Sequence, residues 1–491
     1  MKKILSKYEE AIIFVVGAAF AFLIITLLSP TTSLIDRGEP PVVDSAIFQV
    51  IGKNWADGLL PYVTAWDSKG PLIFWINAVG YWLAGSAKGI FWLQLLANSI
   101  AFWLIYKTYR LGFNKTWSTV CWFLTIFAYS KLYDQGNNVG EYLLPLLAWA
   151  AYLILKWVNT DSEGMPKYHP AGYAFLYGAI LAFALLTRLT NAIGICGITA
   201  VIGIHLIYRQ QWQNLGANIV AFIAVFGVLL LPFVIYFASH GALYEMWYGT
   251  LLYNLEYAGS QTGSLTGLTY WSHLFVVCSS CWLLVVTGIM VMLLDRNRRW
   301  VGAMWLVAGG LSAIWLQRSH LAPHYAIVYV PYFVISLLEL NRLRKTIIPE
   351  FGKMAITAII DFELATMAVT GVFVVKCVDY FSTPDARIAI WREMISDIPE
   401  REMKTAFVGY NIYPDLYVYE NIRPCLPYFA LQDWEIQCGQ SLKPRIRAAF
   451  SSGKAKWILI ANGKTNIDDI LAKQYTLVKT QSDFRLYHIK K

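Results

Sequence analysis

Long apolar stretches, separated by short charged or polar breaks, run through the first three quarters of the chain. A bilayer core about 30 Å thick needs about 20 mostly apolar residues for each helical crossing, so stretches of this kind predict transmembrane helices. We therefore expect an α-helical polytopic membrane protein. Eleven spans are predicted, at residues 11–29, 89–106, 116–131, 141–157, 171–187, 189–207, 215–238, 271–294, 301–317, 322–340 and 354–376.

The apolar stretch at residues 71–86 is left out of this count. A helix of this length covers only about 24 Å, which is short for a crossing. Counting it as a span would also reverse the side of every later loop. We predict instead a helix that lies along the outer membrane surface, within a first outer loop of residues 30–88, because its Trp and Tyr side chains suit the interface.

Lysine and arginine collect in alternate breaks, and positively charged loops stay in the cytoplasm. This predicts a cytoplasmic N-terminus and assigns most of the net charge of +9 to topology, because no basic patch is interleaved with base-stacking aromatics as nucleic acid binding would require. The competing interpretation of the first span as a cleaved signal peptide lacks an A-x-A-like site. The basic residues on the predicted inner side are Lys2, Lys3, Lys7, Lys107, Arg110, Lys115, Arg296, Arg298, Arg299, Arg342, Arg344 and Lys345.

From residue 377 the sequence becomes mixed and charged, which indicates a soluble domain over 377–491 after a membrane domain over 1–376. A helix is predicted from Thr383-Pro384-Asp385, and strands from KTAFVGY, KWILIAN, YTLVK and FRLYHI. The odd number of spans places this small α/β domain outside the cytoplasm. Cys425 and Cys438 form a disulfide there if the compartment is oxidising, and the sequence leaves that pairing open.

The first outer loop holds the strongest candidates for chemistry, since a connector of this length is usually functional. Apolar residues recur at helical spacing over 44–55, which predicts a short amphipathic helix with Asp44 at its N-cap. Asp44 either only caps this helix or serves as a general base at the membrane surface. Asp67 and Lys69 follow in the same loop.

Three later outer turns carry further candidates. Glu141 begins a span, where it either stabilises the helix dipole or contacts substrate. Arg188 either anchors a helix at lipid headgroups or binds a phosphate. Ionisable residues at the bilayer edge mark substrate pathways, which favours a functional role for Arg318, His320, His324 and Tyr325. The two histidines have no third ligand nearby, so a metal is not favoured and no cofactor is expected.

The run from Asp44 to Pro71 reads D-S-x-x-F, G-x-x-P-Y and W-D-S-K-G-P-L, and it resembles the first outer loop of GT-C-type membrane glycosyltransferases. The nearest branch is similar to protein O-mannosyltransferases and the lipid A aminoarabinose transferase. The resemblance covers roughly residues 10–345, with NNVGEYLLP, TRLTNAIG and RSHLAPHY in supporting positions. It implies that Asp44 is the catalytic base and that Lys69 contacts the donor phosphate. The family commonly has Asp-Glu where this chain has Asp44-Ser45.

The expected reaction is therefore transfer of a hexosyl or pentosyl group, with inversion, from a polyprenyl-phosphate donor to a glycan, lipid or protein acceptor at the outer face of the cytoplasmic membrane. Asp44 would remove the acceptor proton, and Glu141 would orient the acceptor or donor sugar as a second catalytic residue. Lys69 and Arg318 are the first candidates to stabilise the departing phosphate, followed by Arg188 and His324. A flippase or other transporter for lipid-linked oligosaccharides, and a polysaccharide polymerase or ligase, remain alternatives. Transporters tend to carry charges at mid-membrane and inverted repeats, neither of which is evident here.

Overall fold

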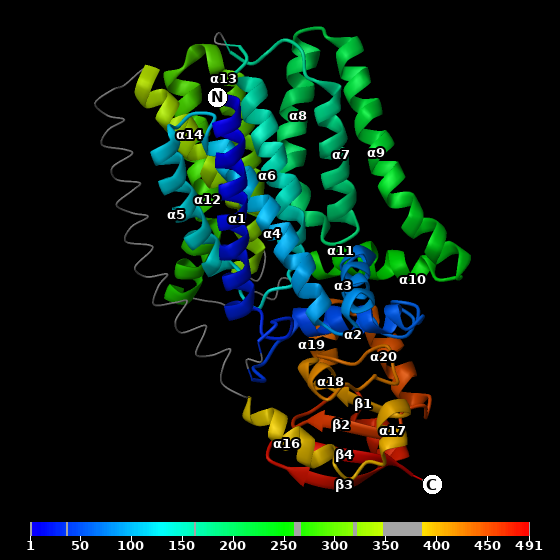
Figure 1. The fold of residues 1–491 in the computed structure, drawn as a ribbon. Helices are drawn as coiled ribbons and strands as arrows, with labels where there is room; N and C mark the ends of the chain where they lie inside the picture. Colours follow the sequence, from blue (N-terminus) through cyan, green and yellow to red (C-terminus); the bar gives the residue numbers. More distant parts are fainter. Residues whose placement is uncertain are drawn as a thin grey trace. The chain divides into compact units, whose positions relative to one another are not determined.

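The computed structural model describes residues 2–35, 38–161, 164–259, 267–317, 322–346 and 385–490. The chain divides into two compact units (Figure 1). Unit 1 comprises Met1–Ile25, Gln94–Pro232 and Gly263–Cys377, and unit 2 comprises Thr26–Leu93, Phe233–Thr262 and Val378–Lys491.

Unit 1 is a bundle of long apolar helices. Among the described residues, eight helices are long and apolar enough to cross a membrane, which confirms the polytopic helical class. Helices cover ten of the eleven predicted spans, although α7 is short and α5 is not one of these eight, and the span at 354–376 lies outside the described residues. The helices are α1 (Lys2–Leu28), α4 (Lys88–Tyr109), α5 (Lys115–Leu132), α6 (Val139–Val158), α7 (Ala171–Leu185), η1 (Leu189–Ala192), α8 (Ile193–Tyr208), α9 (Trp212–Ser239), α12 (Gly267–Leu294), η3 (Arg296–Arg298), α13 (Arg299–Gln317), η4 (Pro323–Tyr329) and α14 (Val330–Thr346).

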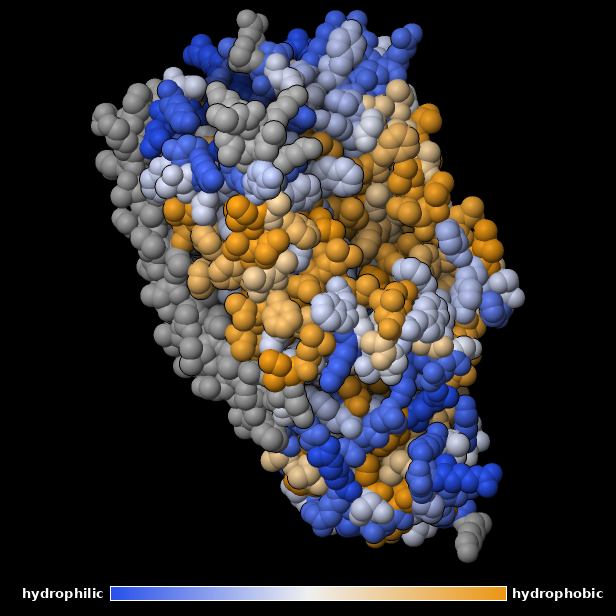
Figure 2. All heavy atoms as spheres, in the orientation of Figure 1, coloured by the Kyte–Doolittle hydropathy of each residue, from blue (hydrophilic) through white to orange (hydrophobic). Residues whose placement is uncertain are grey.

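Basic turns meet at one end of unit 1. Glu9 near the start of α1 lies 3.4 Å from Arg110 and 3.7 Å from Lys115 in the α4–α5 turn. Lys345 at the end of α14 donates to the Gly112 carbonyl of that turn at 3.2 Å. Hydrophilic residues gather at the end of unit 1 that carries the N-terminus, while its sides are apolar (Figure 2). The charge clusters that the sequence assigned to one side therefore do share one end of the bundle.

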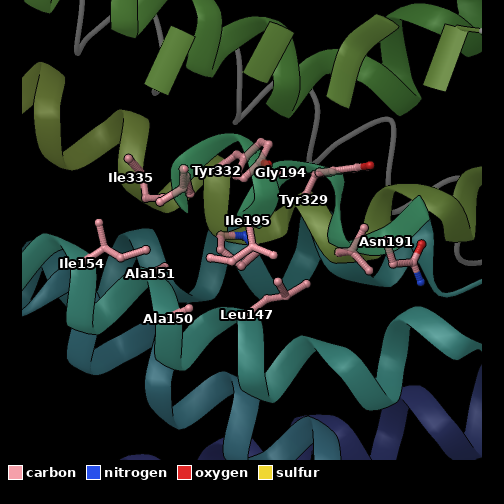
Figure 3. Close-up of a pocket in the computed structure, with 13 residues that line it drawn as sticks. Leu147, Ala150, Ala151, Ile154, Asn191, Gly194, Ile195, Tyr329, Tyr332 and Ile335 are labelled. Carbon is pink, nitrogen blue, oxygen red and sulfur yellow. The ribbon is translucent and has the colours of Figure 1, made fainter. Parts of the chain in front are cut away.

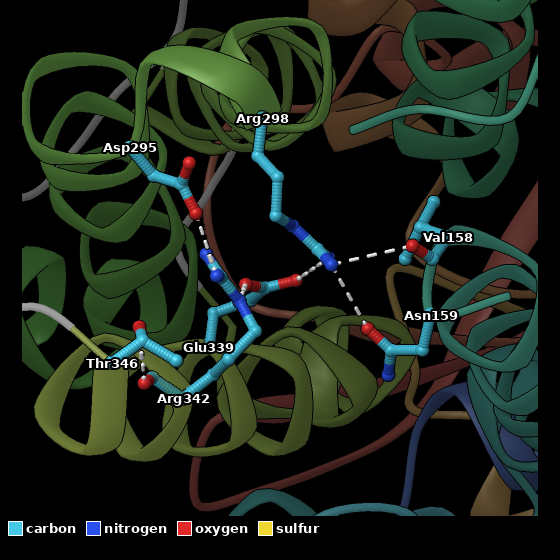
Figure 4. A network of polar contacts seen from close by, with 7 residues as sticks. All are labelled: Val158, Asn159, Asp295, Arg298, Glu339, Arg342 and Thr346. Atoms are coloured by element: carbon cyan, nitrogen blue, oxygen red, sulfur yellow. Dashed lines mark hydrogen bonds and ion pairs between the residues drawn. The ribbon is translucent and has the colours of Figure 1, made fainter. Parts of the chain in front are cut away.

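A buried ion network ties three helix ends together there (Figure 4). Arg298 is 4% exposed and pairs with Glu339 at 3.1 Å, and Arg342 bonds both Glu339 at 2.9 Å and Asp295 at 2.7 Å. The Arg298 guanidinium also donates to Asn159 at the end of α6. Because each of these buried charges has an opposite partner, the network holds the three helix ends together.

Two short helices of the first outer loop pack together in unit 2. They are α2 (Asp44–Ala56) and α3 (Pro71–Ala84). A Cβ on Gly52 would lie 2.4 Å from that of Asn77, so the absence of a side chain permits this close crossing. The 14 residues of α3 cover about 21 Å, in keeping with the prediction that this stretch does not span.

The C-terminal part of unit 2 is a four-stranded mixed sheet with short helices, as predicted. The strand order is β1-β2-β4-β3, with β1 parallel to β2 and the other pairs antiparallel. The helix predicted near Thr383 begins at Ala386, with the Asp385 side chain capping it, and its Trp391 is buried. The elements are α16 (Ala386–Ile395), α17 (Glu400–Thr405), β1 (Phe407–Tyr410), α18 (Asp415–Tyr419), α19 (Gln432–Cys438), α20 (Leu442–Ser451), β2 (Trp457–Ala461), α21 (Asp468–Gln474), β3 (Tyr475–Gln481) and β4 (Phe484–Ile489).

The first outer loop and the C-terminal sheet domain belong to the same unit. Glu39 pairs with Arg392, Asp57 pairs with Arg423, and the Tyr419 hydroxyl donates to the carbonyl of Pro40 at 2.7 Å. Unit 2 contains Val378–Lys491 together with earlier stretches of chain that the linear division assigned to the membrane domain. Cys425 is a buried free thiol, so the disulfide with Cys438 is not formed.

Candidate functional site

The loop between α2 and α3 contains Asp67 and Lys69. Tyr62 has a left-handed backbone conformation, φ 67°, and its hydroxyl donates to the Lys69 carbonyl at 2.7 Å. The Lys69 amide in turn donates to the Asp67 carboxylate at 3.1 Å. A bulky residue with positive φ is strained, and such strain collects at functional sites.

A π-helical turn, η2 (Tyr248–Leu252), closes over this segment between the short helices α10 (Leu243–Trp247) and α11 (Tyr253–Gly259). A Cβ at Gly249 would lie 2.7 Å from the Tyr62 ring and 3.1 Å from the Asp67 carbonyl. The Asn254 amide donates to the Ser68 carbonyl at 2.6 Å. Single π-helical turns are frequent at functional sites, and here the turn holds the Asp67–Lys69 segment in place.

Asp44, Asp67 and Lys69 interact electrostatically. Asp67 is 6% exposed, and this burial raises the pKa of its carboxyl; the Lys69 charge opposes the shift, and the Asp44 charge adds to it. Asp44 is the first residue of α2, and Val43 occupies the N-cap. The predicted N-cap position of Asp44 was therefore wrong by one residue. These three predicted residues do come together.

The C-terminal domain adds an acid that the sequence analysis missed. Glu435 of α19 is 8% exposed, and burial together with the Asp67 charge raises the pKa of its carboxyl well above the ordinary value, while Lys69 opposes the shift. The Tyr253 hydroxyl donates to the Glu435 carbonyl at 2.8 Å, and the Tyr253 ring packs edge-on to Trp66 at 5.1 Å. No sequence signal marks Glu435, because Asp67 and Lys69, which lie near it in space, are more than 360 residues away along the chain.

Tyr253 thus has a packing role. Tyr253 is 2% exposed and contacts both Trp66 and α19 within unit 2.

In unit 1, the predicted residues Arg188, His324 and Tyr325 lie in contact with one another or with Asp134. His324 lies 2.9 Å from Asp134 through its Nδ1, and the Arg188 guanidinium stacks 3.4 Å above the Tyr325 ring centroid. Asp134 comes from the α5–α6 turn, Arg188 from the α7–η1 turn, and both Tyr325 and His324 from η4. Within the described ranges no carboxylate pairs with Arg188, so this cation is available to an anion.

Glu141 is fully buried in unit 1 and its hydrogen bonds are satisfied. Its carboxylate accepts hydrogen bonds from Tyr133 at 2.7 Å, Asn98 at 2.6 Å and Gln94 at 3.1 Å. It also closes a capping box with Asn138 at the start of α6. These contacts favour the helix-stabilising interpretation of Glu141 over the catalytic one.

Two of the predicted site residues, Arg318 and His320, lie outside the described residues. In the part of the chain that is described, no group of three His, Cys, Asp or Glu side chains could hold a metal ion. The expectation that the reaction needs no cofactor stays a prediction.

Several apolar hollows lie among the described residues of unit 1, and two of them adjoin the predicted site residues or their turns. One, about 500 Å³ in volume, is lined by α7, α8 and α13, and its wall includes Leu189, next to Arg188. The other is lined by α6, α8, η4 and α14, with the Asn191 amide and the Tyr329 hydroxyl near one end, on the right in Figure 3. The first is large enough for part of an apolar chain, whereas the second, about 20 Å³ in volume, is not.

No protein-family model and no curated protein matches the sequence. Among solved structures, ArnT from Cupriavidus metallidurans bound to undecaprenyl phosphate is similar, with a TM-score of 0.57 and 14% identity over 97% of each chain. This is the GT-C fold. An oligosaccharyltransferase from Archaeoglobus fulgidus, in the apo form, has the same TM-score at 13% identity, over 93% of this chain and 70% of that one.

The GT-C fold was the expectation drawn from the first-loop motif, and it is confirmed. At these identities the likeness concerns the fold. The assignment of chemistry therefore rests on the residues of the two clusters described above.

Proposed function

We propose that this chain is an inverting glycosyltransferase that moves a hexosyl or pentosyl group from a polyprenyl-phosphate donor to a glycan, lipid or protein acceptor. The observation that carries the proposal is the grouping of Asp44, Asp67 and Lys69 in unit 2 of a GT-C fold. ArnT, which has this fold, has been crystallised with a polyprenyl phosphate, undecaprenyl phosphate.

The reaction is a single displacement at the anomeric carbon. Asp44 takes the proton of the acceptor hydroxyl or amine as that atom bonds to the anomeric carbon. The bond from this carbon to the phosphate oxygen breaks, and its electron pair leaves on the phosphate. Lys69 stabilises the negative charge that develops on the phosphate, an interaction that is stronger in the transition state than in the ground state.

Further residues bind the lipid-linked donor. Arg188 and His324 of unit 1, together with Arg318 and His320, are cations suited to phosphate, and Tyr325 holds the Arg188 guanidinium in one plane. The polyprenyl chain occupies the apolar hollow beside Leu189. Because the donor lies in the membrane, no nucleotide-binding domain is needed.

The protein is proposed to act in the cytoplasmic membrane, with Asp44 and the C-terminal domain on the periplasmic or extracellular side. The basic end of unit 1 supports this orientation under the positive-inside rule. The sheet domain packs on the first outer loop, which supports their placement on one side of the membrane.

Substitution of Asp44 with Asn tests the proposal, because it removes the base and keeps the shape. Transfer from a polyprenyl-phosphate sugar should fall by a factor of about 10² to 10⁴, since a positioned base contributes that much. The measurement is transfer by purified protein, using donors and acceptors found by mass spectrometry of envelope glycans from a deletion strain. Asp57→Asn, at the other end of the same helix in an exposed ion pair, is the matched control. Transfer at the wild-type rate by the Asp44→Asn protein would contradict the assignment of Asp44 as the general base.

A further inference from the structure

Glu435 is buried beside Lys69 and Asp67 without a side-chain hydrogen bond. Its carboxyl interacts electrostatically with both residues, yet among the described residues no donor bonds to it. Buried carboxyls in native proteins are normally hydrogen-bonded, and an exception calls for a functional explanation. Gln432 in the same helix differs from Glu435, because its side-chain amide donates to the carbonyls of Gly409 and Tyr428.

A second polar group of the same cluster also lacks a partner. Trp66 is 2% exposed, and within the described chain its indole N–H donates to nothing. Trp66 directly precedes Asp67, and its ring contacts Tyr253, whose hydroxyl holds the Glu435 carbonyl. The unpartnered Trp66 indole N–H therefore lies in the same set of contacts that holds the Glu435 backbone.

The backbone around Glu435 is held firmly, so its position is not incidental. Gly439 packs so closely on Tyr253 that an added Cβ would lie 2.4 Å from the ring. The Trp66 amide donates to the Pro427 carbonyl at 2.9 Å. These two contacts hold residues 427–439 against Tyr253 and against the loop that contains Trp66 and Lys69.

The neighbouring acidic charge favours the protonated form of Glu435 over the ionised form. If Asp67 and Glu435 were both ionised beside Lys69, two buried like charges would repel one another. A protonated Glu435 avoids this repulsion and becomes a hydrogen-bond donor. Carboxylic acids kept neutral by apolar or acidic surroundings serve as donors to developing anions in other enzymes.

We propose that Glu435 acts from the C-terminal domain as a neutral carboxylic acid, donating a hydrogen bond to the same phosphate group of the lipid-linked donor that Lys69 binds. The proton stays on Glu435 throughout, so no group is transferred. The inference rests on the proposed function, and it gives the C-terminal domain a direct part in donor recognition.

The test compares Glu435→Gln, which keeps a neutral donor of nearly the same shape, with Glu435→Met, which keeps the volume and removes the donor. Binding of undecaprenyl phosphate to each purified protein is measured, and transfer is measured alongside. We expect the Gln variant to match the wild type, and the Met variant to lose about 10²-fold in transfer, as when one oxyanion donor is removed, and to bind the lipid more weakly. Exposed Glu400, changed in the same two ways, is the control for loss of an acid.

Each other outcome overturns the inference. Equal loss in the Gln and Met variants would show that Glu435 works as an anion, and wild-type binding and transfer by both would show that it contacts no substrate. Either result leaves the proposed function standing. Failure of the wild type to bind the lipid at all would overturn the inference and the proposed function together. Melting temperatures of the variants identify any loss that comes from misfolding.

Discussion

Glu141 in unit 1 and Glu435 in unit 2 are both buried carboxyls on helices, with 0% and 8% of their surface exposed. Glu141 accepts hydrogen bonds from three side chains and one backbone amide. Glu435 accepts none from the described residues and instead shares its surroundings with Asp67 and Lys69. A buried acid whose partners are complete stabilises the fold, whereas one without side-chain partners that lies beside Lys69 is a candidate for binding substrate.

Among the substitutions that test this comparison, those of Lys69 should change the transfer rate most. Lys69→Met should lower transfer by about 10²-fold, because it removes the cation that stabilises the departing phosphate. Lys69→Arg should recover part of the activity, since the charge remains while its geometry changes. Initial rates at saturating donor give the measurement. Lys53→Met, which changes a half-buried lysine of α2 that bonds Asn421, is the control. An unchanged rate for Lys69→Met would remove Lys69 from the mechanism.

Glu141→Ala should mainly affect stability. Removing a carboxylate that accepts several buried hydrogen bonds should cost about 3 kcal/mol or more, because hydrogen bonds to charged groups contribute roughly 1.5–3 kcal/mol each. Transfer per folded molecule should stay close to that of the wild type. Thermal unfolding and rates measured on monodisperse protein separate the two effects. A stable but inactive Glu141→Gln protein would contradict the comparison and restore the catalytic role first considered for Glu141.

Asp415 should have the smallest effect on transfer, because it lies among structural contacts of unit 2. Burial raises the pKa of its carboxyl to about 7, and its Oδ2 has no hydrogen-bond partner in the described chain. The folded state therefore holds a proton that the unfolded state has released. Stability contributed by this group is full below about pH 4 and declines as pH rises toward 7.

Asp415→Asn should abolish that decline while leaving transfer intact. Melting temperatures of the wild type and the variant across pH 4 to 8 provide the check. Parallel pH profiles for the two proteins would show that Asp415 is not the titrating group. Such a result would leave the comparison between Glu141 and Glu435 untouched.

Much of the fold could be predicted because its signals are local. The length of the apolar stretches marks the spans. Arg110 and Lys115 pair with Glu9, and Lys345 bonds the Gly112 carbonyl, so these three predicted basic residues lie at one end of unit 1. The strand over 457–461 and the hairpin over 475–489 also followed from alternation and turn residues. Candidate residues in the turns were harder. His324 and Arg188 were expected on the same side, but their contacts with Asp134 and Tyr325 depend on how separate helices pack.

The sequence by itself determined the membrane architecture, the order of the elements and the first-loop motif that contains Asp44 and Lys69, because length, charge and hydrophobic period act over short distances along the chain. Only the tertiary structure distinguished the two acids. It surrounded Glu141 with donors from α4, α5 and α6, and it brought Glu435 to Lys69 across more than 360 residues of chain. Hydrogen-bond satisfaction and burial depend on such distant contacts, and no local pattern records them.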